Sequence, residues 1–224
     1  MPGPGSHMIY GLGSGLGLMV ASEGRFSPHH CICYAVNAFF GPDIGSFSEW
    51  LSGFGSAFGF GDSLGSTVSD LIHHPFYYIL FLGFPLSLLY SWASRFALHK
   101  GLLHSISGVP LSRMQCFLLI SAGSLSHFFL DHLFEENGKS STYTWILSTG
   151  WWDGRAPINP DAVLVVSLLC IALIIGFAYI HRVRPSKSFR TQYNQSVILI
   201  MVIAALYCLC KSIISCTTSS TGRW

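Results

Sequence analysis

The stretch that decides the fold is Ala162-Val-Leu-Val-Val-Ser-Leu-Leu-Cys-Ile-Ala-Leu-Ile-Ile-Gly-Phe-Ala-Tyr-Ile180, which polar residues scarcely interrupt. A second run, from Ser196 to Cys216, contains a single charged residue, Lys211. Each run approaches the roughly 20 residues that a helix needs to cross the hydrocarbon core of a bilayer. Half of the 224 residues are hydrophobic and only 10% are charged, against about 25% in soluble domains. The sequence therefore predicts an integral membrane protein.

Four further apolar segments precede these two runs. Pro75 to Phe96 and Leu111 to Phe134 are long enough to span a membrane. Met8 to Ala21 and Pro28 to Gly41 would each extend only about 21 Å as helices, so we expect them to form a short hairpin packed into the bundle. The predicted fold is an all-α, polytopic membrane bundle of about six apolar helices, two short and four spanning.

Three regions follow from this division. We expect residues 1–138 to form the helical membrane region that carries the chemistry, residues 139–160 to form an aromatic surface loop, and residues 161–224 to form a C-terminal two-helix membrane hairpin. No basic residue precedes the first apolar segment, and no Ala-x-Ala-like cleavage site follows it. That segment is therefore expected to be retained and not removed as a secretory signal.

The charged residues divide unevenly between the two faces that six alternating segments would create. If His7 lies on face one, nine of the ten acids lie on face one, and Glu23 is the exception. Face two would hold eight of the twelve basic residues, namely Arg25, Arg95, Lys100, Arg113, Arg182, Arg184, Lys187 and Arg190. By the positive-inside rule, face two is predicted to be cytosolic and face one to point to a lumen or periplasm. The expected partner is membrane lipid and not nucleic acid, because the basic residues form no patch interleaved with aromatic residues.

Acids and histidines recur before the first segment, after the second, before the third and near the end of the fourth. The residues concerned are His7, Asp43, His73, His74, His127 and Asp131. If the segments run alternately up and down, all of these side chains gather on face one. Carboxylate oxygens and imidazole nitrogens are the donors that a divalent metal site needs. The sequence therefore predicts a divalent metal site, with zinc as the expected ion.

His127 and Asp131 are the best-defined members of this set. They stand four residues apart, so on a helix they lie on one face about 6 Å from each other. An ionised aspartate in an apolar segment is costly unless it is paired or bound to a metal, which makes this couple a functional candidate. The structural alternative is a histidine–aspartate hydrogen bond that only stabilises the bundle.

Three short pieces of sequence resemble a known family, the bacterial inner-membrane, predicted metal-dependent hydrolases, which are thought to share chemistry with zinc-dependent phospholipases C. The pieces are Gly5-Ser-His7, Pro42-Asp-Ile-Gly45 and Gly123-Ser-Leu-Ser-His-Phe-Phe-Leu-Asp131, with Gly138 downstream. They cover roughly residues 5 to 138, and the last two apolar runs are unmatched. The resemblance implies a membrane-embedded hydrolase that binds its metal through these histidines and aspartates.

The chain departs from the family pattern at two places. Gly45 stands where the family has a second aspartate, and Glu49 is a candidate to replace it as the proton acceptor. The stretch His99-Lys-Gly-Leu-Leu-His104-Ser closely resembles the family's histidine motif. If the segments alternate in direction, however, this stretch lies on the basic face. The pair His73 and His74 has the helical-hairpin spacing to His127 that the family shows. Both sets remain candidates, with His73 and His74 favoured.

Two functions are consistent with these residues. The first is a membrane-embedded metal-dependent hydrolase in which Asp43 or Glu49 accepts a proton, acting on a lipid or lipid-linked phosphoester. The second is a non-catalytic integral membrane protein with a structural polar or metal cluster, which Gly45 favours. Metal transport is disfavoured, because it would require acids and histidines through the middle of several spans.

The remaining glycines, cysteines and histidines have simpler expected roles. The spacing of Gly11, Gly13, Gly15 and Gly17 predicts close helix contact. A phosphate-binding loop is disfavoured there, because no P-loop lysine follows. The seven cysteines lie mostly in apolar segments and are expected to behave as small hydrophobic residues. The histidines expected at interfaces or helix caps are His29, His30, His132 and His181.

Overall fold

The computed structural model describes residues 4–39, 41, 75–137, 160–182 and 188–221, and these residues form helices and turns, with no strand among them. In chain order the helices are α1 (Pro4–Ala21), α2 (Pro28–Phe39), α5 (Pro75–Tyr77), the π-helical turn η1 (Tyr78–Leu82), α6 (Gly83–His99), α7 (Arg113–Asn137), α9 (Pro160–Ile180) and α10 (Phe189–Thr221). Because α5, η1 and α6 follow one another without a break, they form one continuous rod. The all-α prediction is confirmed for this part of the chain.

Each of the six predicted apolar segments lies largely within one of these helices, but several boundaries differ, most of all at the start of α10. The last apolar run was predicted to begin at Ser196, whereas α10 already begins at Phe189. The reason is a local helix cap at Ser188. Its hydroxyl oxygen accepts a hydrogen bond from the Thr191 backbone N–H at 3.3 Å, as a favourable N-cap residue does.

Two helical stretches among the described residues are long and apolar enough to cross a membrane, Tyr78–His99 and Arg190–Cys210. Their mean hydropathies are 1.3 and 1.9. Only 22% of the first stretch and 17% of the second is buried in the bundle, so most of their apolar side chains point outward. A core helix of a soluble protein would be mostly buried, whereas a membrane helix can be apolar all round. His7–Ala21 and Leu168–Ile180 are shorter apolar helices.

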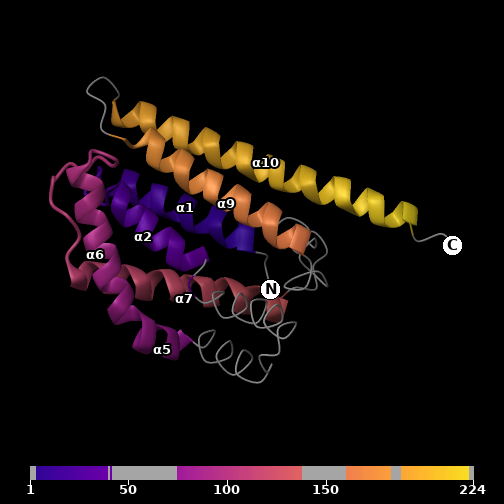
Figure 1. Ribbon diagram of the computed structural model, residues 1–224, viewed down its shortest axis with the longest axis horizontal. Coiled ribbons are helices and arrows are strands. Elements are labelled where there is room, and N and C mark those ends of the chain that lie inside the picture. The colour runs from indigo at the N-terminus through magenta and orange to yellow at the C-terminus, as the bar shows by residue number, and fades with distance from the viewer. Residues whose placement is uncertain (1–3, 40, 42–74, 138–159, 183–187, 222–224) are drawn as a thin grey trace, which may run out of the picture.

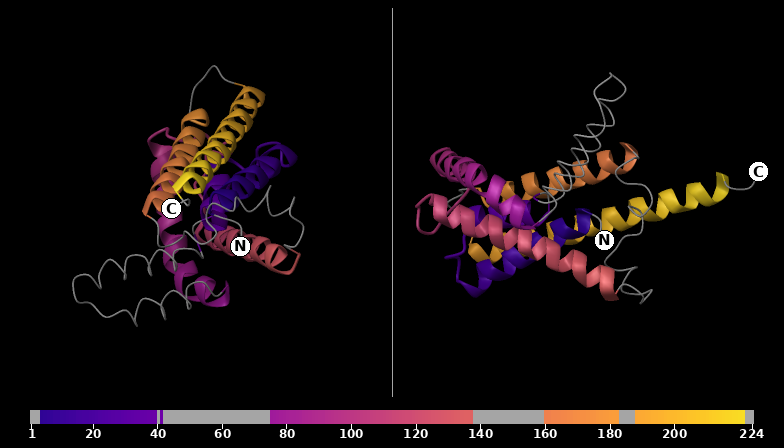
Figure 2. Two further views of the ribbon diagram at one scale, coloured as in Figure 1. Left: turned by 90° about the vertical axis from the view of Figure 1, so that its right-hand side faces the viewer. Right: turned by 90° about the horizontal axis from the view of Figure 1, so that it is seen from below.

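Rods that follow one another in the chain run in opposite directions, and α9 and α10 lie side by side as an antiparallel hairpin (Figure 1). The short helices α1 and α2 lie between this hairpin and α7, and α6 packs against α7 (Figure 2). We call the end at which α1 begins and α2 ends the site end. The opposite end, at which α6 ends and α7 begins, is called the basic end.

Helix α1 lies at the centre of the main hydrophobic core. Its buried residues Met8, Leu12 and Leu16 recur every four positions and therefore form one stripe along the helix. This stripe belongs to a cluster with buried residues of α9 and α10, namely Cys170, Leu173, Phe177, Ile200, Ile203 and Tyr207. The C-terminal hairpin is therefore held to the N-terminal half of the chain by apolar packing.

The other side of α1 approaches α2 through two of its glycines. A Cβ atom added at Gly11 would lie 2.9 Å from the Ala38 Cβ, and one added at Gly15 would overlap the Cys31 Sγ. Gly13 and Gly17 would meet nothing within 4 Å. The predicted close contact is thus confirmed for Gly11 and Gly15 and wrong for the other two, because residues two positions apart point to different sides of a helix.

Four cysteines pack as small apolar side chains, as predicted. Cys31 and Cys170 belong to the main core cluster. Cys33 and Cys116 belong to a second cluster between α2 and α7. All four are at most 6% exposed.

Candidate functional site

The site end contains two buried histidines from helices that are distant in the sequence. His7 lies in the first turn of α1, and His127 lies in the second half of α7. Their rings stack with centroids 4.0 Å apart and planes inclined by 19°. The side chains are 1% and 0% exposed, respectively. Two residues that the sequence predicts for one metal site are therefore in direct contact.

Gly123 explains why α7 comes close enough to α2 to place His127 there. A Cβ atom added at Gly123 would lie 2.7 Å from the Tyr34 carbonyl oxygen and 2.8 Å from the Asn37 Cβ. Such distances are not tolerated, so only glycine permits this approach of the two helices. His127 follows one turn later on the same face of α7. The approach at Gly123 thus brings the imidazole to the last turn of α2.

A backbone carbonyl of α2 determines which nitrogen of His127 carries the proton. His127 Nδ1 lies 3.1 Å from the Ala38 carbonyl oxygen. Because a carbonyl only accepts hydrogen bonds, Nδ1 must be the donor, and in the neutral ring the lone pair then resides on Nε2. Metal-ligating histidines are commonly oriented in this way, with the second ring nitrogen donating to a backbone carbonyl. His127 therefore has the tautomer that a ligand requires.

The start of the α5–η1–α6 rod is hydrogen-bonded to the same turn of α2. The Tyr78 hydroxyl donates a hydrogen bond to Asn37 Oδ1 at 2.8 Å, and Asn37 Nδ2 donates to the Cys33 carbonyl at 2.7 Å. Tyr78 is 2% exposed and opens the π-helical turn. A Cβ atom added at Gly41 would lie 2.8 Å from the Tyr78 hydroxyl oxygen. This network was missed by sequence reasoning, although a lone asparagine in an apolar helix is a polar signal that could have indicated it.

The other predicted site residues are described less completely. Asp131 belongs to α7, one turn beyond His127, but its side chain lies outside the described residues. Asp43, Glu49, His73 and His74 also lie outside the described residues. Among the side chains that the structure describes, no group of three or more histidines, cysteines or acids gathers as a metal site would need.

The alternative ligands His99 and His104 lie at the basic end. His99 is 21 residues beyond Tyr78 along one continuous rod, which corresponds to about 30 Å at the rise of an α-helix. The backbone N–H of His104 donates to the His181 carbonyl at the end of α9, at 2.9 Å. Both side chains are exposed. One ion cannot contact either of them together with His127, so this alternative does not fit the structure.

The stacked histidines approach the geometry of a zinc site without reaching it. Two imidazoles on one tetrahedral zinc ion, with Zn–N bonds of about 2.0–2.1 Å, hold their ring centres roughly 5 Å apart. The observed centroid distance is 4.0 Å. Binding would therefore require side-chain rotations that separate the rings by about 1 Å and also tilt them, because the in-plane lone pairs of nearly parallel stacked rings do not converge on one ion. The tautomer, the burial and the residue types fit a divalent metal.

Two histidines that were expected at helix ends lie at the start of α2. The hydroxyl oxygen of Ser27 lies 3.2 Å from His29 Nε2 and 2.9 Å from His30 Nδ1. The Ser27 backbone N–H also donates to His30 Nδ1 at 3.2 Å. His30 thus accepts a hydrogen bond from the backbone N–H of the N-cap residue Ser27, as the N3 residue of a capping box does. The expected capping role is confirmed for His30.

His181 directly follows α9 at the basic end and is only 1% exposed. Its Nε2 lies 2.9 Å from the Ser196 hydroxyl of α10. Burial, together with the smaller effect of the neighbouring His104, lowers the pKa of His181 from 6.5 to about 4. A histidine with this pKa is neutral at pH 7, so it acts as a polar link between the two helices of the hairpin. His132 lies outside the described side chains.

Comparison of the chain with protein-family models, with curated proteins and with solved structures finds no significant match.

Proposed function

We propose that this protein is a multi-pass membrane hydrolase that depends on a divalent metal, with zinc as the preferred ion. The juxtaposition of His7 and His127, buried and stacked at 4.0 Å, carries the proposal. The proposed ligand set is His7, Asp43, His73 or His74, His127 and Asp131. The resemblance of residues 5 to 138 to the inner-membrane metal-dependent hydrolases supports the same assignment.

Chain continuity supports the inclusion of residues from both connections at the site end. Asp43 follows Gly41 by two residues, which limits their Cα–Cα separation to about 7 Å. His74 precedes Tyr78 by four residues, which limits that separation to about 14 Å. Gly41 and Tyr78 both adjoin the turn of α2 that receives the His127 hydrogen bond. On this basis we include Asp43 and His73 or His74 in the proposed ligand set.

The chemistry follows from the residue types. A bound zinc ion would supply a water molecule whose pKa is lowered to near 7 and would polarise a phosphoryl oxygen. The Ala38 carbonyl holds His127 in the orientation of a ligand. Glu49 would accept the proton of the attacking water, or Asp43 would do so if it does not itself bind the metal. A lipid or lipid-linked phosphoester is the proposed substrate class, because the site end would lie at the level of lipid headgroups.

The proposed topology uses four spanning helices, the α5–η1–α6 rod, α7, α9 and α10, with α1 and α2 as a shorter hairpin among them. Two of these helices meet the criteria of length and hydropathy within the described residues. The described basic side chains at the ends of the helices favour a cytosolic basic end. The site end would then face a lumen or periplasm.

A second candidate function is a non-catalytic membrane protein with a structural cluster at the same place. Two observations favour it. The stacked rings are about 1 Å closer than two ligands of one zinc ion would be, so the pair also suits a packed, metal-free core. Gly45 also stands where the resembled family has an acid.

Metal analysis of the purified chain tests the proposal. We expect about one zinc ion per wild-type chain. The zinc affinity of His127→Ala and of Asp131→Ala should fall by at least about 10- to 100-fold, which is the loss that follows mutation of a residue hydrogen-bonded to a metal ligand. His104→Ala is the matched control, because His104 is exposed at the basic end. Equal zinc content in all four proteins would refute the site. A circular dichroism spectrum of each variant distinguishes lost metal from lost fold.

Chelation separates the two candidate functions. A catalytic site keeps an open coordination position, so removal of the metal should abolish hydrolysis of a phospholipid while the protein stays folded. A structural site should instead unfold when the metal is removed. The readouts are released headgroup and the thermal unfolding midpoint, measured on the same sample.

A further inference from the structure

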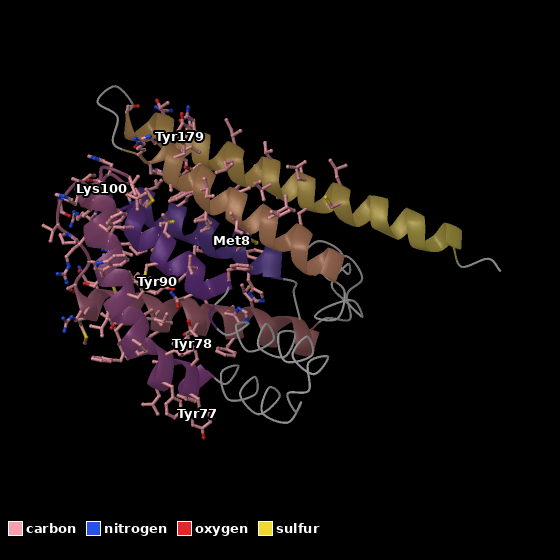
Figure 3. All side chains as sticks on the ribbon, viewed as in Figure 1. Met8, Tyr77, Tyr78, Tyr90, Lys100 and Tyr179 are labelled. Atoms are coloured by element: carbon pink, nitrogen blue, oxygen red, sulfur yellow. The ribbon has the colours of Figure 1, made fainter. Side chains whose placement is uncertain are left out.

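The basic end presents a group of exposed cationic side chains that come from five different connections and helix ends. The described members, all exposed, are Arg25, Arg95, Lys100, Arg113, Arg182 and Arg190. Glu23 is the one acid at this end among the described side chains. Nitrogen atoms gather around Lys100 at this end of the bundle (Figure 3). The electrostatic field of this surface is therefore positive.

The connection from Lys100 to Ser112 is tied to the helices beneath it. The Ser91 hydroxyl of α6 donates to the Leu111 carbonyl at 2.8 Å, and the Leu111 backbone N–H donates to the Ser94 hydroxyl at 3.0 Å. The His104 backbone N–H donates to the His181 carbonyl at the end of α9. This connection is therefore held against both α6 and α9 as a defined surface.

The same connection exposes apolar side chains between Lys100 and Arg113, the first residue of α7. Ile106 and Val109 are each 62% exposed, and Leu102 is 43% exposed. Exposed apolar side chains flanked by lysine and arginine are typical of segments that lie in the membrane interface, where the apolar groups enter the acyl boundary and the cations remain among the phosphates. The outward face of α6 continues this surface with Trp92 and Phe96, which stack at 5.8 Å.

We propose that the basic end is a binding surface for anionic phospholipid headgroups, with Ile106 and Val109 inserted below the phosphates of that leaflet. Lys100 and Arg113 flank these two residues and contact the lipid phosphates. Each cation near an anionic leaflet contributes about 1 kcal/mol, or roughly a five-fold preference. The inference rests on the membrane placement proposed above and is independent of the metal site.

Lipid selectivity tests the cationic part. The protein is reconstituted in nanodiscs of equal phosphatidylglycerol and phosphatidylcholine, and the lipids it retains are counted by native mass spectrometry. Wild type should be enriched in phosphatidylglycerol, and Lys100→Gln with Arg113→Gln should lower that enrichment by about five-fold per charge removed. The matched control, Lys100→Arg with Arg113→Lys, should keep it. Retained lipid of bulk composition in wild type would overturn the proposal.

Side-chain protection tests the inserted part. In the same nanodiscs, Ile106→Cys should react with a membrane-impermeant maleimide at least about ten-fold more slowly than Ser107→Cys. Ser107 is exposed beside Ile106. The reason is that a thiol inserted into the membrane is shielded from the aqueous reagent. Peptide-resolved mass spectrometry reads each position separately from the native cysteines. Equal rates would refute insertion.

The outcomes also distinguish this inference from the proposed function. A chain that fails to enter the nanodisc would overturn both the membrane placement and this surface. A chain that enters but shows neither selectivity nor protection would overturn this surface alone. The zinc content should be unchanged by the Lys100 and Arg113 variants, because these residues lie at the end opposite His7 and His127.

Discussion

The histidines show how strongly the role of a residue depends on its surroundings. His7 and His127 form a buried stacked pair, whereas His30 caps α2 through Ser27. His181 is buried against Ser196, and His99 is exposed at the end of α6. The same imidazole therefore serves as ligand candidate, helix cap, buried polar link and surface group. Burial and the partner of each ring nitrogen decide among these roles.

His181 should make the stability of the protein depend on pH. Its pKa is about 4 in the folded protein, against 6.5 for an ordinary histidine. Above pH 6.5 the ring is neutral in both states. Between pH 6.5 and 4 the unfolded chain binds a proton that the folded protein does not, so stability falls as the pH falls. At pH 5 the loss from this residue is up to about 2 kcal/mol.

The variant His181→Gln should remove most of that loss, because glutamine can still bond to Ser196 but does not titrate. The measurement is the free energy of unfolding by denaturant in detergent micelles, compared between pH 7 and pH 5. His99→Gln is the control for the loss of one imidazole at the same end. An equal change in the two variants would contradict the assignment to His181.

At the scale of the helices, small residues determine which pairs approach closely. Gly11 and Gly15 let α1 contact α2, and Gly123 lets α7 contact α2. These contacts place α2 between the two helices that carry the stacked histidines. Gly13 and Gly17 share the spacing but not the contact. The separation of the glycines predicts that one stripe can form an interface, and only the packing shows which stripe does.

Gly123→Ala should destabilise the protein by about 1–3 kcal/mol, because the added methyl group meets backbone atoms of α2 that cannot move independently. The contacts are 2.7 Å to the Tyr34 carbonyl oxygen and 3.0 Å to the Ala38 nitrogen. Zinc affinity should fall as well, since His127 would be displaced from its carbonyl partner. Thermal unfolding and metal content measure the two effects.

Gly13→Ala is the matched control for this prediction. The new methyl group would meet nothing within 4 Å, and alanine stabilises a helix interior by about 0.5–1 kcal/mol relative to glycine. We therefore expect this variant to be as stable as wild type or slightly more stable. A loss of stability equal to that of Gly123→Ala would show that the close approach of α7 to α2 is not the cause.

For the whole molecule, antiparallel packing separates two kinds of chemistry. The stacked histidines of α1 and α7 lie at the site end. Exposed arginine and lysine side chains lie at the basic end, where Figure 3 labels Lys100. In a membrane, such a separation determines which aqueous compartment each end meets. We therefore expect the site end and the basic end to be accessible from opposite sides.

Glycosylation mapping in a eukaryotic membrane tests this orientation. The native sequon Asn194-Gln-Ser lies near the start of α10 at the basic end and should remain unmodified, because glycosylation occurs in the lumen. A sequon introduced within residues 52–62 should be modified. A mass shift on treatment with a glycosidase is the readout. Modification at Asn194 together with an unmodified engineered sequon would invert the proposed topology.

The sequence by itself determined that the chain is helical, where its apolar segments lie, and that alternation would bring His7 and His127 to one end. These properties depend on local hydropathy, segment length and chain reversal, which can be read along the chain. Only the tertiary structure decided that the two rings stack, that Gly123 admits α7 to α2, and that Tyr78 is bonded to Asn37. Such contacts depend on how the surfaces of helices distant in sequence fit together, and close packing leaves few alternatives once they meet.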